Sequence, residues 1–156
     1  MHAHDLIKKQ HRAVEAAYEE FQAATDDDRK EDLAKRILTD LTVHATIEEE
    51  IYYKALEEAG EEEMVKEFKK DHNEAKLLIG KLTIMDEDWK GFDESMDKLM
   101  SAILAHVAVE EDEEMPKVEE ILSAEALEDL GTRMEERWDE LQESTLKRVW
   151  AALKPS

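Results

Sequence analysis

The sequence predicts an all-α fold, an up-down-up-down antiparallel four-helix bundle with an additional C-terminal helix. The 156 residues include only four glycines and two prolines and are rich in Ala, Glu, Lys and Leu, a composition that favours helices. Four successive segments also place apolar residues at alternating spacings of three and four, which gives each helix one inward stripe. Strand signals are missing from the sequence.

Acidic or glycine-bearing stretches separate the helical segments. These breaks fall at residues 24–32, 57–63, 85–95 and 116–123. The predicted helices span residues 5–24, 29–59, 62–84 and 92–120, and a fifth follows at 124–153. Short connections make consecutive helices antiparallel neighbours. Pro116 lacks the N–H that closes a helical turn, so we expect it to kink or end the fourth helix.

The chain is expected to divide into a bundle and an extension. Residues 1–120 would form the four-helix bundle, and residues 121–156 a helical extension. The extension has a rough apolar stripe made of Leu127, Leu130, Met134, Trp138, Leu141 and Val149. That stripe would pack across the bundle or against a second subunit, so an oligomer could form through this helix.

The inward stripes of the second and fourth helices contain polar residues where leucine would be expected. The second stripe is Ile37, Leu41, His44, Glu48, Ile51 and Ala55. The fourth is Phe92, Met96, Leu99, Ile103, His106, Glu110 and Glu113. The first and third stripes each contain one histidine, at His11 and His72. Every helix of the predicted bundle therefore has a histidine in its core stripe.

These histidines should lie at similar heights along the bundle. They are 33, 28 and 34 residues apart. Half a helix, a turn and half of the next helix add up to about 30 residues. The spacing of four residues places each glutamate one turn beyond its histidine, on the same face. Six polar residues should therefore converge in the core: His11, His44, Glu48, His72, His106 and Glu110.

Metal ions explain such a polar core best. A buried, unpaired carboxylate costs several kcal/mol, and a domain has only about 5–15 kcal/mol of net stability. Four imidazoles and two carboxylates are too many donors for one tetrahedral zinc, and they suit iron or manganese, with zinc able to bind in vitro. Each carboxylate could bridge two ions, with His11 and His44 on one ion and His72 and His106 on the other.

Composition excludes several other classes of function. Lys and Arg total 21 against 42 Asp and Glu, a formal charge of −21 that repels nucleic acid and anionic membranes. Cysteine is absent, which excludes disulfides, thiolate metal sites and cysteine nucleophiles. The longest apolar run is five residues, 149–153, which is too short to span a membrane.

The N-terminal stretch has no signal-peptide core, so we expect a cytoplasmic protein. No nucleophile–base pair or phosphate loop occurs, and no catalytic side chain is assigned. His2 and His4 could form an incidental metal site, but we expect a frayed terminus there.

The order of these motifs resembles the hemerythrin family, in particular its bacterial branch of hemerythrin-like HHE cation-binding domains. The motifs are a first histidine, then "HATIE", "DHNEAK" and "HVAVE". The resemblance covers about residues 1–120. It implies a non-haem centre of two iron ions, bridged by oxo or hydroxo groups, with the four histidines as terminal ligands and the two glutamates as bridges. Members bind oxygen, handle iron, or sense and remove oxidants.

Two departures from the oxygen carriers of this family bear on function. Their fifth histidine, four residues after the third-helix ligand, is replaced here by Lys76. Glu110 stands four residues after His106, where the carriers have an aspartate at five. An open position or a substitute ligand such as Tyr52 would result. We therefore expect a protein that reacts with or binds dioxygen or hydrogen peroxide; whether it is an enzyme is left open. The alternatives are a non-catalytic iron-binding, storage or sensing module and a metal-free interaction bundle.

Overall fold

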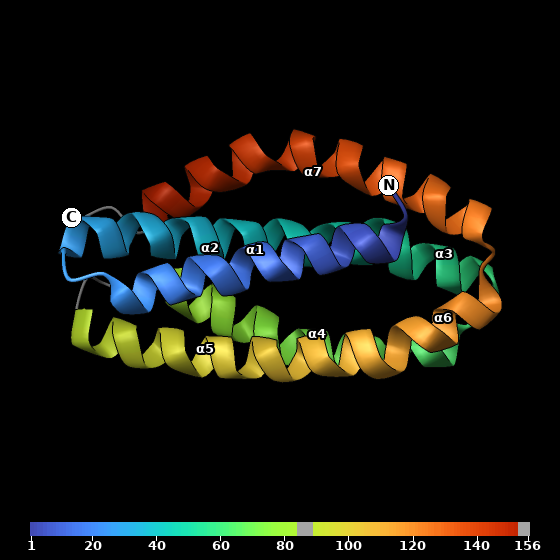
Figure 1. Ribbon diagram of the computed structural model, residues 1–156, viewed down its shortest axis with the longest axis horizontal. Coiled ribbons are helices and arrows are strands. Elements are labelled where there is room, and N and C mark those ends of the chain that lie inside the picture. Colours follow the sequence, from blue (N-terminus) through green and yellow to red (C-terminus); the bar gives the residue numbers. More distant parts are fainter. Residues whose placement is uncertain (84–88, 153–156) are drawn as a thin grey trace.

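The computed structural model describes residues 1–83 and 89–152, and every regular element within them is a helix. Four helices run side by side: α1 (Ala3–Ala23), α2 (Asp27–Ile47), α4 (Glu62–Thr83) and α5 (Trp89–Val109) (Figure 1). The predicted all-α bundle with a further C-terminal helix is confirmed. The break expected at 85–95 lies partly outside the described residues, as does the side chain of Val149.

Two helices of the bundle continue without a break through a short π-helical stretch. Helix α2 continues through η1 (Glu48–Tyr52) into α3 (Tyr53–Glu58). Helix α5 continues through η2 (Glu110–Glu114) into α6 (Met115–Ile121). Pro116 therefore does not end its helix. It stands in the first turn of α6, directly after the π-helical stretch η2 has ended, and the chain remains helical to Ile121.

Each π-helical stretch contains one more residue per turn than an α-helix, so it rotates the following side chains relative to the predicted stripe. Ile51, expected inside, is only half-buried, whereas Tyr53 is fully buried. Glu113, also expected inside, is exposed, and Glu114 takes the inward position. The predicted stripes were thus correct up to Glu48 and Glu110, and wrong by about one residue after them.

The apolar core consists of two clusters. One contains residues such as Val14, Leu41, Ala75 and Ile103. The other gathers side chains from seven helical elements, among them Ile7, Ile47, Phe68, Met115 and Leu130. In chain order, His11, His72 and Glu110 each fall between a residue of one cluster and a residue of the other. The polar layer expected from the sequence therefore divides the apolar core in two.

The C-terminal helix α7 (Ala124–Ala152) lies along α2 and α1 (Figure 1). Leu127, Leu130 and Met134 are buried in this contact. The backbones approach so closely that a Cβ atom at Gly131 would lie 1.8 Å from the carbonyl oxygen of Met1. Any other residue at Gly131 would push α7 away from the start of α1.

The N-terminal residues are ordered against the bundle, so the expected frayed terminus is wrong. α1 begins at Ala3, and the ring of His2 accepts the N–H of His4 as an N-terminal cap. The His4 side chain is 3% exposed. These two histidines therefore belong to the folded structure.

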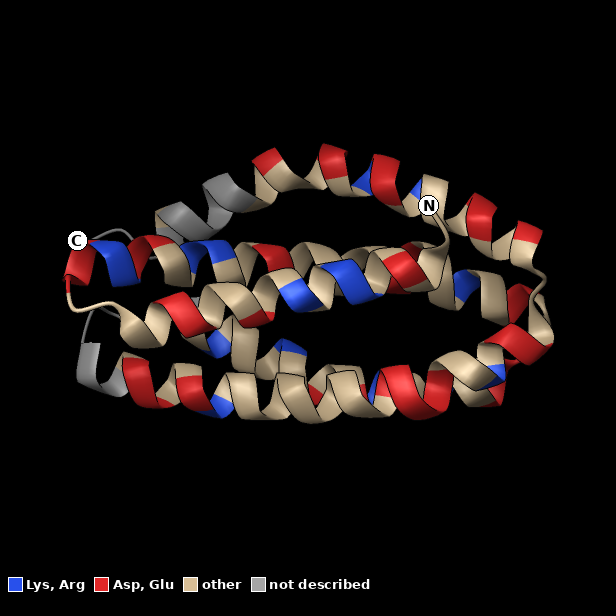
Figure 2. Ribbon diagram, viewed as in Figure 1, with Lys and Arg blue, Asp and Glu red and all other residues tan. Residues whose placement is uncertain are grey.

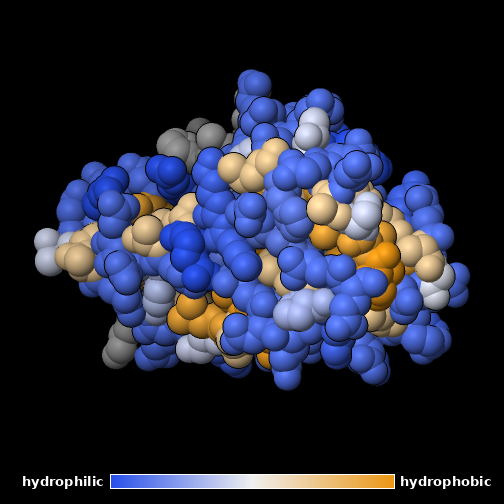
Figure 3. Space-filling model, turned by 45° about the vertical axis from the view of Figure 1, so that its right-hand side comes forward, coloured by the Kyte–Doolittle hydropathy of each residue, from blue (hydrophilic) through white to orange (hydrophobic). Residues whose placement is uncertain are grey.

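Acidic residues occur along all the main helices (Figure 2), and the face seen in Figure 3 is mostly hydrophilic with small apolar areas between. None of the helices within the described residues is long and apolar enough to span a membrane.

Candidate metal centre

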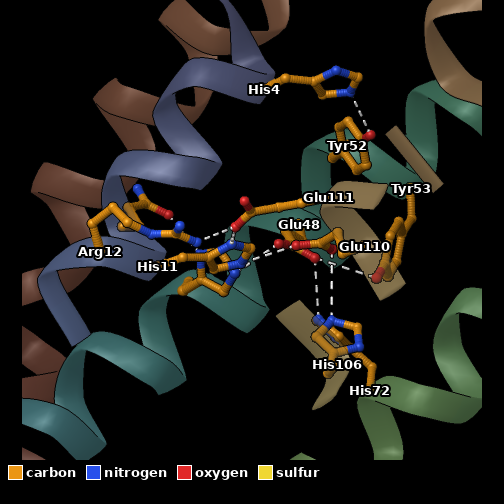
Figure 4. A network of polar contacts seen from close by, with 12 residues as sticks. His4, His11, Arg12, Glu48, Tyr52, Tyr53, His72, His106, Glu110 and Glu111 are labelled. Atoms are coloured by element: carbon orange, nitrogen blue, oxygen red, sulfur yellow. Dashed lines mark hydrogen bonds and ion pairs between the residues drawn. The ribbon is translucent and has the colours of Figure 1, made fainter. Parts of the chain in front are cut away.

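The structure brings together the six polar residues singled out from the sequence (Figure 4). Glu48 and Glu110 are 0% and 1% exposed, and the side chains of all four histidines are buried as well. The histidines come from α1, α2, α4 and α5, one from each helix of the bundle. The glutamates are the first residues of η1 and η2.

Each carboxylate lies between two imidazoles from different helices. Glu48 places Oε1 2.7 Å from Nε2 of His44 and Oε2 3.1 Å from Nε2 of His72. Glu110 places Oε1 3.0 Å from Nε2 of His11 and Oε2 3.6 Å from Nε2 of His106. The two oxygens of each glutamate thus face opposite histidine pairs, which is the arrangement that a bridging carboxylate requires.

The donors fall into two overlapping groups, each compact enough to hold one ion. One contains His11, His44 and both glutamates, and the other contains His72, His106 and Glu48. The ring centroids are 4.9 Å apart within the first histidine pair and 5.1 Å within the second. This pairing of histidines is the one expected from the order of the helices.

Hydrogen bonds on the outer side hold two of the imidazoles in position. Nδ1 of His44 lies 2.6 Å from Oε1 of Gln10, and Nδ1 of His11 lies 2.7 Å from a carboxylate oxygen of Glu111. Arg12 in turn binds Glu111. An acceptor at Nδ1 keeps the proton there and leaves the Nε2 lone pair directed inward, as outer partners of metal-bound histidines commonly do.

The second histidine pair is held less firmly. Nδ1 of His72 is 3.6 Å from Oε1 of Glu49, which also accepts a 3.0 Å bond from Lys76. Nδ1 of His106 has no hydrogen-bond partner within the described part of the chain. The two halves of the site therefore differ in how strongly their ligands are oriented.

Several inward-facing atoms in the layer lack a hydrogen bond of good geometry within residues 1–83 and 89–152. They are Nε2 of His11, His44 and His106, Oε1 of Glu48, and both carboxylate oxygens of Glu110. Buried polar atoms without partners are costly, and metal ions would use these lone pairs. The nitrogen and oxygen donor set fits iron. The residues present therefore fit a dinuclear centre.

The electrostatics of the layer favour charged forms in the absence of metal. Burial opposes protonation of His72, but Glu48 and Glu49 outweigh it and raise the pKa of His72 to about 10. The pKa values of His11 and His106 are also raised, against burial, by contact with Glu110. Burial alone would raise the pKa of Glu48, yet His44 and His72 hold it well below its ordinary value. Metal binding must therefore displace protons from this layer.

The two tyrosines of the "EIYY" segment have different partners. The Tyr52 hydroxyl, named above as a candidate for an extra metal donor, lies 2.7 Å from Nε2 of His4. The Tyr53 hydroxyl instead donates to Oε2 of Glu48 at 3.2 Å. The π-helical stretch causes this exchange, because it turns the residue five positions after Glu48 toward the site. Figure 4 shows the two rings pointing in different directions.

Sequence reasoning did not identify the outer partners of the histidines or Glu114. Glu114 is 5% exposed, and burial together with Glu110 raises the pKa of its carboxyl to about 7. A signal existed for Gln10 and Glu111, because Gln10 directly precedes His11 and Glu111 directly follows Glu110, which stands one turn beyond His106. Glu114 could not be found from α-helical spacing, because η2 shifts it inward.

A small cavity of about 30 Å³ adjoins the four histidines. Its other walls are mostly apolar and include Leu41, Ile79, Ile103 and Val107, and Lys76 also lines it. A space of this size accommodates about one water-sized molecule. Lys76, at the position of the missing fifth histidine, is half-exposed and paired with Glu49.

Comparisons with known proteins agree with this site. The chain matches the model of the hemerythrin HHE cation-binding domain over residues 2–118. It is 29% identical over 124 residues to an uncharacterised hemerythrin-like protein of Schizosaccharomyces pombe, covering 78% of this chain and 61% of that protein. It is 26% identical over 151 residues to the uncharacterised protein Rv2633c of Mycobacterium tuberculosis, covering 94% of this chain and 91% of the relative.

A solved structure shares the fold. It is the crystal structure of a hemerythrin HHE cation-binding domain-containing protein, the Rv2633c homologue from Mycobacterium kansasii. The TM-score is 0.80 at 21% sequence identity, and the match covers 98% of this chain and 99% of the other.

Proposed function

The chain belongs to the hemerythrin HHE cation-binding domain family, and from this premise we propose that it is a non-haem di-iron protein that binds or reacts with dioxygen or hydrogen peroxide. The observation that carries the proposal is the opposed placement of the two carboxylates, each with one oxygen toward either histidine pair. Residues 1–120 would hold the centre, and residues 121–156 would form the extension.

We assign the ligands from this geometry. His11 and His44 would hold one iron, His72 and His106 the other, and Glu48 and Glu110 would bridge them. Bound there, two irons would supply reversible one-electron changes at neighbouring ions. Tyr53, through its hydroxyl on Glu48, would hold one bridging carboxylate in a fixed orientation.

The surroundings support a small diatomic ligand or peroxide as substrate. The adjoining cavity of about 30 Å³ is walled largely by apolar side chains, which exclude bulk water and larger molecules. Lys76 contributes an ammonium where the oxygen carriers place an imidazole, so one coordination position would stay free. A free position favours reaction with peroxide over simple reversible oxygen carriage.

Metal content and an optical spectrum in air test the proposal. The purified chain should hold two irons and absorb in the near-ultraviolet and visible range, and it should consume added peroxide catalytically. A folded protein that stays colourless with ferrous iron and air would refute the di-iron assignment.

The second candidate is a non-catalytic module that stores iron or reports iron and oxygen status. The charged layer favours it too, because metal would replace protons there and change the stability of the bundle. This candidate predicts iron-dependent melting without loss of peroxide. Measuring peroxide consumption and the melting curve on the same iron-loaded sample separates the two functions.

A further inference from the structure

A second cluster of metal-binding side chains lies where the start of α1 meets α6. His2, His4 and Glu119 each offer a ligand atom, and these atoms lie within 4.8 Å of one another. The cluster shares no residue with the six polar residues of the central layer. We propose that His2, His4 and Glu119 bind one divalent first-row transition ion of the zinc type, at a site separate from the dinuclear centre.

The backbone at His2 explains why two histidines so close in sequence converge. Residues two apart on an α-helix point in different directions. His2 precedes the helix as its N-cap, however, with extended backbone at ψ 137°. This conformation brings its ring to 5.2 Å from the ring of His4, centroid to centroid. The Nδ1 atom of His2 accepts the N–H of His4. A neutral imidazole has a single lone pair on its ring nitrogens, so an ion would either replace this N–H at Nδ1 or bind Nε2 once the ring proton has moved to Nδ1.

His4 provides the buried donor. Its side chain is 3% exposed, and Nδ1 has no hydrogen-bond partner within the described residues. The other ring nitrogen, Nε2, lies 2.7 Å from the Tyr52 hydroxyl, and a proton placed there would leave the Nδ1 lone pair free. Burial lowers the pKa of His4, so the imidazole is neutral near pH 7 and able to ligate.

Glu119 supplies the charge that two neutral imidazoles lack. Its Oε2 atom is 3.8 Å from Nδ1 of His4. Two donors that are each about 2.1 Å from one ion can be up to about 4.2 Å apart, so a shared ion fits this separation. The Glu119 side chain is 53% exposed, which leaves a path from solvent. Two imidazoles and one carboxylate, with a position left for water, form a donor set that zinc uses in proteins.

An ion here would join the first turn of α1 to α6. It would also fix His4 against Tyr52, which lies in the same η1 stretch as the bridging Glu48. We expect occupancy to raise the melting temperature. The optical spectrum of iron in the central site should stay unchanged, because the two sites share no ligand.

Calorimetric titration of Zn²⁺ into the iron-loaded full chain tests the site. One Zn²⁺ per chain should bind while the iron content stays constant. Glu119→Gln and His2→Asn should each weaken this binding at least about ten-fold, since each removes a ligand. Asparagine at His2 keeps the helix cap, and Glu120→Gln, an exposed neighbour on α6, makes the same charge change and should have no effect.

The outcomes are distinct from those that test the iron centre. If the chain holds no iron, the same titration is run on the metal-free protein, and the sensitivity to Glu119→Gln and His2→Asn still reports this site. Absence of Zn²⁺ binding would overturn the proposal. So would binding that both variants leave unchanged, or Zn²⁺ uptake matched by loss of iron.

Discussion

Glu48 and Tyr53 are joined twice, once through the backbone and once through their side chains. The carbonyl oxygen of Glu48 accepts the N–H of Tyr53 five residues later, and Oε2 of Glu48 accepts the Tyr53 hydroxyl at 3.2 Å. The same backbone pattern occurs where α5 continues through η2 into α6, and there the N–H of Met115 donates to the carbonyl of Glu110. Both inward glutamates therefore begin a π-helical turn, a feature often found at functional sites.

Tyr53→Phe tests the side-chain part of this link. The ring is fully buried and phenylalanine keeps its packing, so only the hydroxyl on Glu48 is lost. We expect the metal-free protein to lose about 0.5–1.5 kcal/mol of stability. The absorption bands of the iron-loaded protein should also shift. Tyr52→Phe is the control, because its hydroxyl binds His4, and it should leave those bands in place.

Replacing Glu48 or Glu110, the carboxylates proposed as bridging ligands, should reduce the metal content. Glu48→Gln and Glu110→Gln each keep the side-chain shape but remove the negative charge between two histidines. We expect each variant to bind fewer than two irons per chain, measured by elemental analysis after desalting. Glu113→Gln, an exposed residue of η2, should bind as much iron as the parent. Full iron occupancy in both carboxylate variants would contradict the bridging role.

Gln10 is expected to act through His44. Gln10→Leu removes the acceptor that holds Nδ1 of His44 at 2.6 Å, and loss of such outer partners weakens metal binding about 10–100-fold. Competition with a chelator of known affinity measures the change. Gln10→Glu retains an acceptor oxygen and should restore most of the affinity. Equal weakening by both substitutions would indicate a packing effect instead.

Stability should depend on pH in the metal-free protein and much less in the metal-loaded one. The folded pKa of His72 is about 10, above the ordinary 6.5, so its protonation stabilises the metal-free fold. That contribution is complete below pH 6.5 and is lost as the pH rises toward 10. We expect the melting temperature of the metal-free protein to fall by on the order of 10 °C between pH 6.5 and 9.5.

Metal-loaded protein should not show this loss, because ions bind neutral imidazoles and compete with protons. Calorimetric scans of chelator-treated and iron-loaded samples across the same pH range check both expectations. A melting temperature of the metal-free protein that rises with pH would contradict the charged layer described above.

Lys76→His should convert the centre toward the ligand set of the oxygen carriers. The lysine lines the small cavity and pairs with Glu49, one turn from His72. An imidazole at this position would fill a free coordination position, so peroxide consumption should fall several-fold. Lys76→Gln removes the charge without adding a strong ligand, so this variant should consume peroxide at the rate of the parent protein. Unchanged turnover in Lys76→His would mean that this position does not face the iron pair.

The sequence predicted the bundle and the six polar residues because both depend on α-helical spacing. One histidine per stripe, at intervals close to the length of a helix and its turn, was enough to place His11 and His72 in one layer with the others. What it missed has a common cause. Tyr53 and Glu114 lie beyond η1 and η2, where an extra residue per turn changes which side chains face inward.

The N-terminal histidines were misjudged for a different reason. Polar residues at a chain end usually fray, and the sequence contained no sign that α7 and α6 would cover them. Burial of His4 depends on contacts between segments more than 100 residues apart, such as that between His4 and Glu119. Local patterns cannot report contacts of this kind.

The uneven support of the four imidazoles has a kinetic consequence. Gln10 and Glu111 brace the first histidine pair, whereas His106 has no such brace within the described residues. Ions held with different stiffness should leave at different rates, so a chelator would strip the centre in two phases rather than one. The vacancy left after the first phase could accept a different element, which makes the chain a candidate scaffold for mixed-metal centres.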